Sequence, residues 1–176
     1  MGSRLPAPQF SASEDIMAKE KAVKTNAMRM LDKLKIKYEV LTVDIPEFVD
    51  GVQIAMLEGV PVQESFKTLV LQGKSKEYYV FVLPVDKEID LKRAALAVGE
   101  KSVEMIHVKD ITKITGYVRG GCSPLGMKKK FRTVIAAECR GHESVYVSAG
   151  KIGTSMHLRT DDLIRAAEAE TADFTV

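Results

Sequence analysis

The sequence predicts a mixed α/β domain with a small, largely antiparallel sheet, curled or barrel-like, and helices packed outside it. Three observations favour this class. With 45% hydrophobic and 28% charged residues, the 176-residue chain has the composition of an ordinary folded domain. Short runs rich in β-branched and aromatic residues follow one another at close spacing. Helical patterns fall between groups of these runs and do not alternate strictly with them.

The first expected elements are a helix, a strand and a second helix. Apolar residues recur at three- and four-residue steps from Val23 to Leu34, which predicts an amphipathic helix capped near Thr25. Between residues 38 and 43 the period approaches two, which is typical of a strand. Asp50-Gly51 then indicates a turn, and residues 52–60 predict a short helix ended by a glycine and a proline.

A hairpin and a third helix come next. Residues 68–72 and 78–85 have strand composition, and Gly73-Lys74-Ser75-Lys76 between them predicts a tight turn, so we expect the two strands to pair antiparallel. Asp90 is placed to cap a helix over residues 91–98.

The last part of the chain is divided by a glycine-rich loop. A short strand at 103–108 and a helical turn at 111–114 lead into residues 116–126, which hold four glycines and one proline. The remaining strand candidates are 133–137, 144–148 and 155–158. A helix is expected from Thr160, and the acidic tail behind it is expected to fray.

These elements belong to one expected domain, residues 17–176. Residues 1–16 contain prolines and serines but no apolar segment of signal-peptide length, so we interpret them as a cloning remnant or disordered leader. Met17 is the expected natural start.

Composition excludes several function classes. The net charge of 26 − 24 = +2 predicts no strong attraction of the whole molecule to nucleic acid or to an anionic membrane. The longest apolar stretch, eight residues within 78–85, is far shorter than the roughly 20 needed by a membrane-spanning helix. The two cysteines and three histidines lack zinc-ligand spacing, so we expect no metal and a reducing, cytoplasmic setting.

Lys67 is the first candidate for a functional side chain. It opens an apolar strand beside Phe66, where a partly desolvated ammonium can bind a phosphate or stabilise developing negative charge. The alternative is an exposed lysine that protects a strand edge.

The glycine-rich loop is the second candidate. Gly120 and Gly121 allow the backbone to approach a ligand and to offer N–H groups to an oxyanion or phosphate, although a plain surface loop has the same composition. The loop lacks the signature of a nucleotide-binding P-loop. Four cations follow it within five residues, enough for a few phosphate contacts: Lys128, Lys129, Lys130 and Arg132. The alternative for this run is a solvated face.

Two possible nucleophiles in the loop are not favoured. Cys122 has no neighbouring base in the sequence, and His157 reaches it only if the fold brings them together. Ser123 precedes Pro124 and lacks the elbow of a serine hydrolase, so a loop hydrogen-bonding role is expected for it.

Several segments together resemble the YbaK/EbsC family of aminoacyl-tRNA editing proteins, which is related to the editing domain of prolyl-tRNA synthetase. The resemblance covers about residues 20 to 170. It rests on Lys24-Thr25-Asn26-Ala27, Asp50-Gly51-Val52, residues 66–70 and 81–84, Gly116-Tyr117-x-x-Gly120-Gly121-x-Ser123-Pro124-x-Gly126, and Tyr146-Val147-Ser148-Ala149-Gly150. The Gly-Gly-x-Ser-Pro-x-Gly loop followed by lysines is most similar to the free-standing Cys-tRNA(Pro) deacylases of this family.

This resemblance implies a YbaK-like fold and hydrolysis of the ester that joins a wrong amino acid, cysteine or alternatively alanine, to tRNA(Pro). It implies no cofactor and no metal. The implied partner is the tRNA(Pro) acceptor end, with prolyl-tRNA synthetase as a candidate second partner. The implied site has three groups of residues: a catalytic group of Lys67, Gly120 and Gly121; a substrate-binding group of Phe66, Tyr117, Ser123, Pro124 and Gly126; and an RNA-backbone group of Lys128, Lys129, Lys130 and Arg132.

Two routes to ester cleavage stay open. A positioned water requires a general base, and none is recognisable in the sequence. The alternative is attack by the thiol of the substrate's own cysteine on its carbonyl, which requires only correct positioning and explains selectivity for cysteine.

Two positions depart from the pattern of the family. Val43 stands where many relatives carry a tyrosine, and Cys122 stands where others carry an aliphatic residue. The first departure motivates a rival hypothesis, a tRNA-binding or synthetase-associated module without turnover. The second indicates that the Cys122 thiol is dispensable. A third hypothesis, a hydrolase of non-RNA esters or peptides, predicts little salt dependence.

Overall fold

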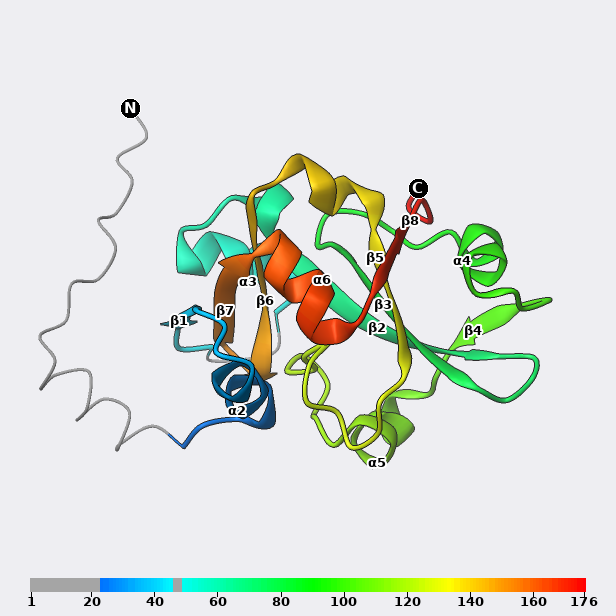
Figure 1. The fold of residues 1–176 in the computed structure, drawn as a ribbon, viewed down its shortest axis with the longest axis horizontal. Helices are drawn as coiled ribbons and strands as arrows, with labels where there is room; N and C mark the ends of the chain where they lie inside the picture. Colours follow the sequence, from blue (N-terminus) through cyan, green and yellow to red (C-terminus); the bar gives the residue numbers. More distant parts are fainter. Residues whose placement is uncertain (1–22, 46–48) are drawn as a thin grey trace, which may run out of the picture.

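The computed structural model describes residues 23–45 and 49–176, which form two β-sheets with helices packed around them (Figure 1). The strands are β1 (Glu39–Thr42), β2 (Phe66–Gly73), β3 (Tyr78–Pro84), β4 (Val103–Met105), β5 (Arg132–Ala136), β6 (Ser144–Lys151), β7 (Thr154–Arg159) and β8 (Glu170–Ala172). The α-helices are α2 (Asn26–Lys33), α3 (Gly51–Glu58), α4 (Leu91–Val98), α5 (Ile111–Thr115) and α6 (Thr160–Ala167). Three 3₁₀ helices join them: η1 (Val62–Glu64), η2 (Val108–Asp110) and η3 (Ala137–Gly141).

The two sheets differ in strand direction. The smaller sheet has the order β1-β7-β6 and is antiparallel. The larger sheet has the order β4-β2-β3-β5-β8, with β2 antiparallel to β3 and β4, and with β5 parallel to both β3 and β8. The predicted mixed α/β class is therefore confirmed, and neither sheet closes into a barrel.

Local sequence explains the boundaries of α2 and α3. The Thr25 side chain accepts a hydrogen bond from the backbone of Met28 and so caps α2, as predicted. Asp50 was expected in a turn; it caps α3 through a reciprocal capping box with Gln53. Gly59 ends this helix in the left-handed conformation, which costs a glycine little.

One expected element is shorter in the structure, and one expectation is wrong. The strand expected at 103–108 pairs only over Val103–Met105, because the chain turns into η2 after it leaves β2. The acidic tail does not fray. Glu170–Ala172 forms β8 beside β5, and the fully buried Phe174 ring packs edge-on against Phe81 with centroids 5.0 Å apart. The free energy gained by burying this one aromatic ring is larger than the cost of ordering the charged residues around it.

The leader assigned to residues 1–16 and the proposed start at Met17 lie outside the described residues. None of the helices within the described ranges is long and apolar enough to cross a bilayer.

The two sheets meet at one edge of β2. Ser65, just before β2, forms a parallel bridge with Tyr146 of β6. In Figure 1, α3 is drawn beside β6 and β7, and the loop that follows α5 lies near the lower end of β6. The fold thus brings β2, β6, β7, α3 and the glycine-rich loop to one place.

Candidate functional site

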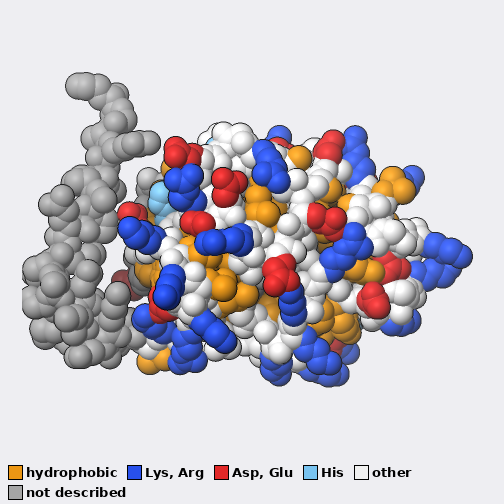
Figure 2. All heavy atoms as spheres, in the orientation of Figure 1, with side chains coloured by type: hydrophobic (Ala, Val, Ile, Leu, Met, Phe, Trp, Pro, Cys, Tyr) orange, Lys and Arg blue, Asp and Glu red, His pale blue; other side chains and the backbone are white. Residues whose placement is uncertain are grey.

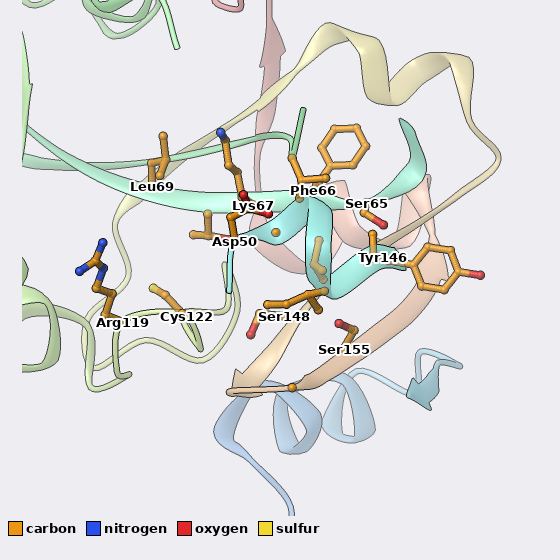
Figure 3. Close-up of a pocket in the computed structure, with 18 of the residues that line it drawn as sticks. Asp50, Ser65, Phe66, Lys67, Leu69, Arg119, Cys122, Tyr146, Ser148 and Ser155 are labelled. Carbon is orange, nitrogen blue, oxygen red and sulfur yellow. The ribbon is translucent and has the colours of Figure 1, made fainter. Parts of the chain in front are cut away.

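A cavity of about 400 Å³ lies at this junction of the two sheets. Its walls are formed by α3, the first half of β2, the β6–β7 hairpin, the segment from Met105 to Ile111, and the glycine-rich loop. Figure 3 shows side chains from these elements gathered around it. Most of the lining is apolar, and a few charged and hydroxyl groups interrupt it, which is typical of a small-molecule binding site.

Lys67 lines this cavity from β2. Its side chain is 26% exposed, and its ammonium lies 4.0 Å from the carboxylate of Glu88, which is itself 86% exposed. An exposed, long ion pair of this kind contributes little and leaves the ammonium able to bind an anion. The neighbouring Phe66 is buried and also contributes to the wall.

The glycine-rich loop reaches the same cavity at Gly120, so Lys67 and Gly120 share one hollow. Gly120 has a φ of 81°, in the region that favours glycine. Gly121 is not part of the lining: a Cβ there would lie 2.9 Å from the backbone nitrogen of Ile152. It permits close packing of the loop against the β6–β7 turn, whose Lys151 lines the cavity.

The four other loop residues predicted to bind substrate lie behind the cavity wall. The Tyr117 hydroxyl donates to the carbonyl of Leu125 at 2.7 Å, and the Ser123 hydroxyl accepts from the Leu125 amide at 3.3 Å. Pro124 is buried beside them, and a Cβ at Gly126 would meet the backbone of α2. The structure places these four residues where they hold the loop in shape; contact with substrate stays a prediction for them.

The predicted RNA-backbone group also lies outside the cavity lining. Lys130 forms an ion pair with Glu168, and Arg132 binds Glu170 and the last carbonyls of α4. Lys128 and Lys129 are exposed. Figure 2 shows cationic and acidic side chains interspersed over the visible face.

Sequence reasoning missed several polar residues of the lining, which lie far apart in the chain. These are Asp50, Glu58, Arg119, Ser148, Lys151 and Ser155. Figure 3 shows Ser148 and Ser155 on the hairpin and Arg119 on the loop. One signal was readable: Glu58 is the only charged residue of α3.

Glu58 has an unusual environment. The hydroxyl of Ser155 donates to its Oε1 at 3.0 Å. Its other oxygen, Oε2, is buried and has no hydrogen-bond partner. Burial raises the pKa of Glu58, and the hydrogen bond from Ser155 opposes that rise.

Cys122 also lines the cavity, and its environment argues against a nucleophilic role. Burial raises the pKa of this thiol to about 11, so it stays protonated at neutral pH. No histidine of the described residues lines the cavity with it. The ring of His157 instead stacks on Tyr146 with centroids 4.0 Å apart, and its Nε2 lies 2.8 Å from Ser144 Oγ.

No group of three His, Cys, Asp or Glu side chains arranged to hold a metal ion occurs in residues 23–45 and 49–176. The polar groups that line the cavity include the Glu58 carboxylate with its unpaired oxygen and several hydroxyls. Three cations also line it: Lys67 from β2, Arg119 from the loop and Lys151 from the hairpin. The cavity can bind an anion and a cation of one ligand at different walls.

Comparison with known proteins gives consistent matches over most of the chain. A family model described as an aminoacyl-tRNA editing domain matches residues 46–166. The protein named "Putative Cys-tRNA(Pro)/Cys-tRNA(Cys) deacylase EbsC" from Enterococcus faecalis is 40% identical over 161 residues, which cover 90% of this chain and 98% of that protein. The "Multifunctional Ser/Thr-tRNA deacylase ProXp-y" of Escherichia coli is 22% identical over 69% of this chain and 75% of that protein.

Solved structures match in fold. The crystal structure of "a putative trans-editing enzyme for prolyl tRNA synthetase" superimposes with a TM-score of 0.75 at 20% identity, covering 88% of this chain and 99% of that one. The crystal structure of the hypothetical protein APE2540 matches with a TM-score of 0.79 at 21% identity, covering 86% of this chain and 100% of that one.

Proposed function

The chain belongs to the family of aminoacyl-tRNA editing domains, and from this premise we propose that it deacylates mischarged tRNA(Pro), with Cys-tRNA(Pro) as its main substrate. The observation that carries the proposal is the shared cavity, which has Lys67 and Gly120 in its walls. The family match supports the reaction class. The name of the relative with 40% identity supports the substrate.

We assign the charged groups of the cavity according to the chemistry of the substrate end. The 3′-terminal adenosine carries a phosphate on one side and the aminoacyl ester on the other. Lys67 and Arg119 are cations that bind the phosphate and orient the ester. Gly120 lies beside them without a side chain, so its backbone can contact the ester carbonyl and stabilise negative charge on its oxygen.

Cavity size alone does not explain a preference for cysteine over alanine. A cavity of about 400 Å³ exceeds the volume of either side chain, and one extra atom in a roomy pocket changes specificity little. We therefore propose that the substrate's own thiol acts as nucleophile. Its sulfur forms a bond to the carbonyl carbon, the bond from that carbon to the ribose oxygen breaks, and the thiol proton ends on that oxygen. Water then hydrolyses the cyclic thioester product.

Deacylation assays test this proposal directly. Cys-tRNA(Pro), Ala-tRNA(Pro), Pro-tRNA(Pro) and tRNA(Pro) carrying S-methylcysteine are incubated with the wild-type chain, with Lys67→Ala and with Lys92→Ala, an exposed lysine of α4 that serves as the matched control. For wild type and Lys92→Ala, we expect release of cysteine from Cys-tRNA(Pro) to be faster than release of the other amino acids. For Lys67→Ala, we expect release of cysteine to be slower than in wild type by about 100-fold or more, as when a charge-stabilising group is removed. Loss of activity on S-methylcysteine supports thiol attack. Equal rates on cysteine and S-methylcysteine support attack by water.

A binding module without turnover is the second candidate. The backbone nitrogen of Val43 donates to the carbonyl of Gly153 at 2.8 Å, and Gly153 lines the cavity, so the departure at Val43 lies next to the site. Binding of Cys-tRNA(Pro) without release of cysteine would identify the module.

We also propose the acceptor end of tRNA(Pro) as the RNA partner and prolyl-tRNA synthetase as a protein partner. The structural neighbour with a TM-score of 0.75 is named as a trans-editing enzyme for that synthetase, which supports the second partner. With a net charge of only +2, this chain is expected to bind tRNA modestly by itself. Addition of the synthetase should therefore increase deacylation at low tRNA concentration.

A further inference from the structure

Two buried polar side-chain atoms in the described residues lack a hydrogen-bond partner, and both belong to residues that line the same cavity. They are Oε2 of Glu58 and Oγ1 of Thr68. A buried polar atom without a partner costs free energy, and such atoms are rare in folded proteins. Their concentration at one cavity indicates that a ligand completes their hydrogen bonding.

The unpaired oxygen of Glu58 favours a ligand of positive charge. An ionised carboxylate only accepts hydrogen bonds, and its strongest partners are cations. No Lys, Arg or His of the described residues forms an ion pair with Glu58 within 4.0 Å. Ser155 occupies only Oε1.

The other ionisable groups in the cavity wall do not replace this partner. They are Asp50, Lys67, Arg119, Cys122, Tyr146 and Lys151. Asp50 Oδ1 accepts from the backbone of Gln53 at 2.9 Å in the capping box. Lys67 pairs with Glu88. Asp50 is exposed, so water can satisfy its other oxygen, and Glu58 is thus the carboxylate of the cavity that has a buried oxygen left for a ligand.

We propose that Glu58 binds the α-ammonium group of the aminoacyl moiety through Oε2, and that it thereby selects tRNA with a free amino acid over N-acylated tRNA. This inference rests on the proposed function, because only an aminoacyl ester brings an ammonium group next to the scissile carbonyl. The rest of the tRNA end offers neutral hydroxyls and anionic phosphates, and a carboxylate repels the latter.

The position of Glu58 gives the substrate a direction. Glu58 ends α3 and contacts β7, whereas Lys67 and Arg119 come from β2 and the loop. Negative and positive charge therefore come from different walls. A substrate with an ammonium at one end and a phosphate at the other matches both only in one orientation.

The raised pKa of Glu58 is consistent with this role. Its first cause is burial, which disfavours the charged carboxylate. A bound ammonium favours the charged form again, so binding and ionisation of Glu58 support each other. Ionised Glu58 is the binding-competent form, and affinity for the ammonium must fall as the pH drops through its pKa.

Binding of two non-hydrolysable ligands tests the inference without any turnover. The ligands are adenosine with cysteine attached through a 3′-amide, and its N-acetyl derivative, which lacks the positive charge. Isothermal titration compares wild type, Glu58→Gln and, as matched control, Glu104→Gln, an exposed glutamate of β4.

We expect wild type and Glu104→Gln to bind the free amine about 10-fold or more tightly than the acetylated ligand, as for a hydrogen bond between charged groups. Glu58→Gln should lose this preference while its affinity for the acetylated ligand stays unchanged. An equal loss for both ligands, or no preference in wild type, would overturn the inference. Deacylation rates, measured separately, identify a general base: if Glu58→Gln slows deacylation of Cys-tRNA(Pro) and of its N-acetyl form equally and leaves both affinities unchanged, the inference is overturned.

Ser155→Ala supplies a second variant that leaves Glu58 in place. The hydroxyl of Ser155 lowers the pKa of Glu58, so removal of this hydroxyl raises that pKa further. The pH at which free-amine affinity falls should therefore move upward in Ser155→Ala, and an unchanged or lower midpoint counts against the inference.

If the binding preference holds but wild type cleaves no aminoacyl ester, the proposed function fails and not the assignment of Glu58. If wild type cleaves the ester without any preference for the free amine, only the assignment fails.

Discussion

At the scale of single residues, the cavity combines a functional requirement with a cost in stability, and Glu58 is the clearest case. Its carboxylate is retained at a site where burial raises its pKa and where one oxygen has no partner. The carboxylate also stands at the last position of α3, where the helix dipole disfavours a negative charge. A residue that lowers stability is typical of a functional site.

The sign of this cost is testable with Glu58→Gln. An acid whose pKa is higher in the folded state binds more protons there, so its contribution to stability falls as the pH rises through the window between the unfolded and the folded pKa. The amide has no such charge and can still accept from Ser155. We expect Glu58→Gln to melt about 1 to 4 °C above wild type at pH 7, with a smaller difference at pH 4. Melting followed by circular dichroism at both pH values measures this; a difference that does not change with pH contradicts it.

Sequence reasoning singled out Lys67, which lines the cavity, and missed Glu58, which also lines it, for a physical reason. Lys67 is a charge within an apolar strand, and that contrast is visible in a short window of sequence. The partner of Glu58 is Ser155, 97 positions away, so no local pattern indicates their contact. Gly121 was assigned to catalysis, yet it lies behind the wall because the fold presses the loop against the β6–β7 turn.

At the scale of elements, capping and turn signals were reliable because they act over a few residues. The β2–β3 hairpin, the cap of α2 and the glycine that ends α3 follow from local chemistry. The tail is the instructive exception. Its charges indicated fraying, but Phe174 inserts into the core and keeps β8 beside β5.

The stability of this tail can be measured with Phe174→Ala. The ring is 0% exposed and packs on Phe81, so its removal leaves a cavity in the core. We expect a loss of about 3 to 5 kcal/mol in the free energy of unfolding by urea. Val176→Ala, at a side chain that is 76% exposed, is the matched control and should change it by less than about 0.5 kcal/mol. Similar effects of the two substitutions would mean that the tail is not part of the core.

At the scale of the whole molecule, function depends on the junction of two sheets. The bridge between Ser65 and Tyr146 joins segments that lie 81 positions apart by residue number, and the cavity forms around it. Strand composition indicated the strands, but it does not indicate which edges of different sheets meet. The resemblance to a family, carried by short motifs, indicated the function before the geometry of the site was known.

The distribution of charge over the molecule makes a final prediction about RNA binding. Arg119 and Lys151 line the cavity, whereas Lys130 lies outside its lining, where it pairs with Glu168. A cation that contacts phosphate releases counterions when RNA binds, so its removal lowers the salt dependence of the binding constant. We expect Arg119→Gln and Lys151→Gln each to reduce the slope of log K against log salt by about 0.7 to 1 for uncharged tRNA(Pro) between 50 and 200 mM salt, and Lys130→Gln to reduce it less. Lys129→Gln tests the exposed lysine run in the same titrations. If Lys129→Gln lowers the slope while Arg119→Gln and Lys151→Gln do not, the RNA backbone follows the lysine run and the cations of the cavity do not contact phosphate.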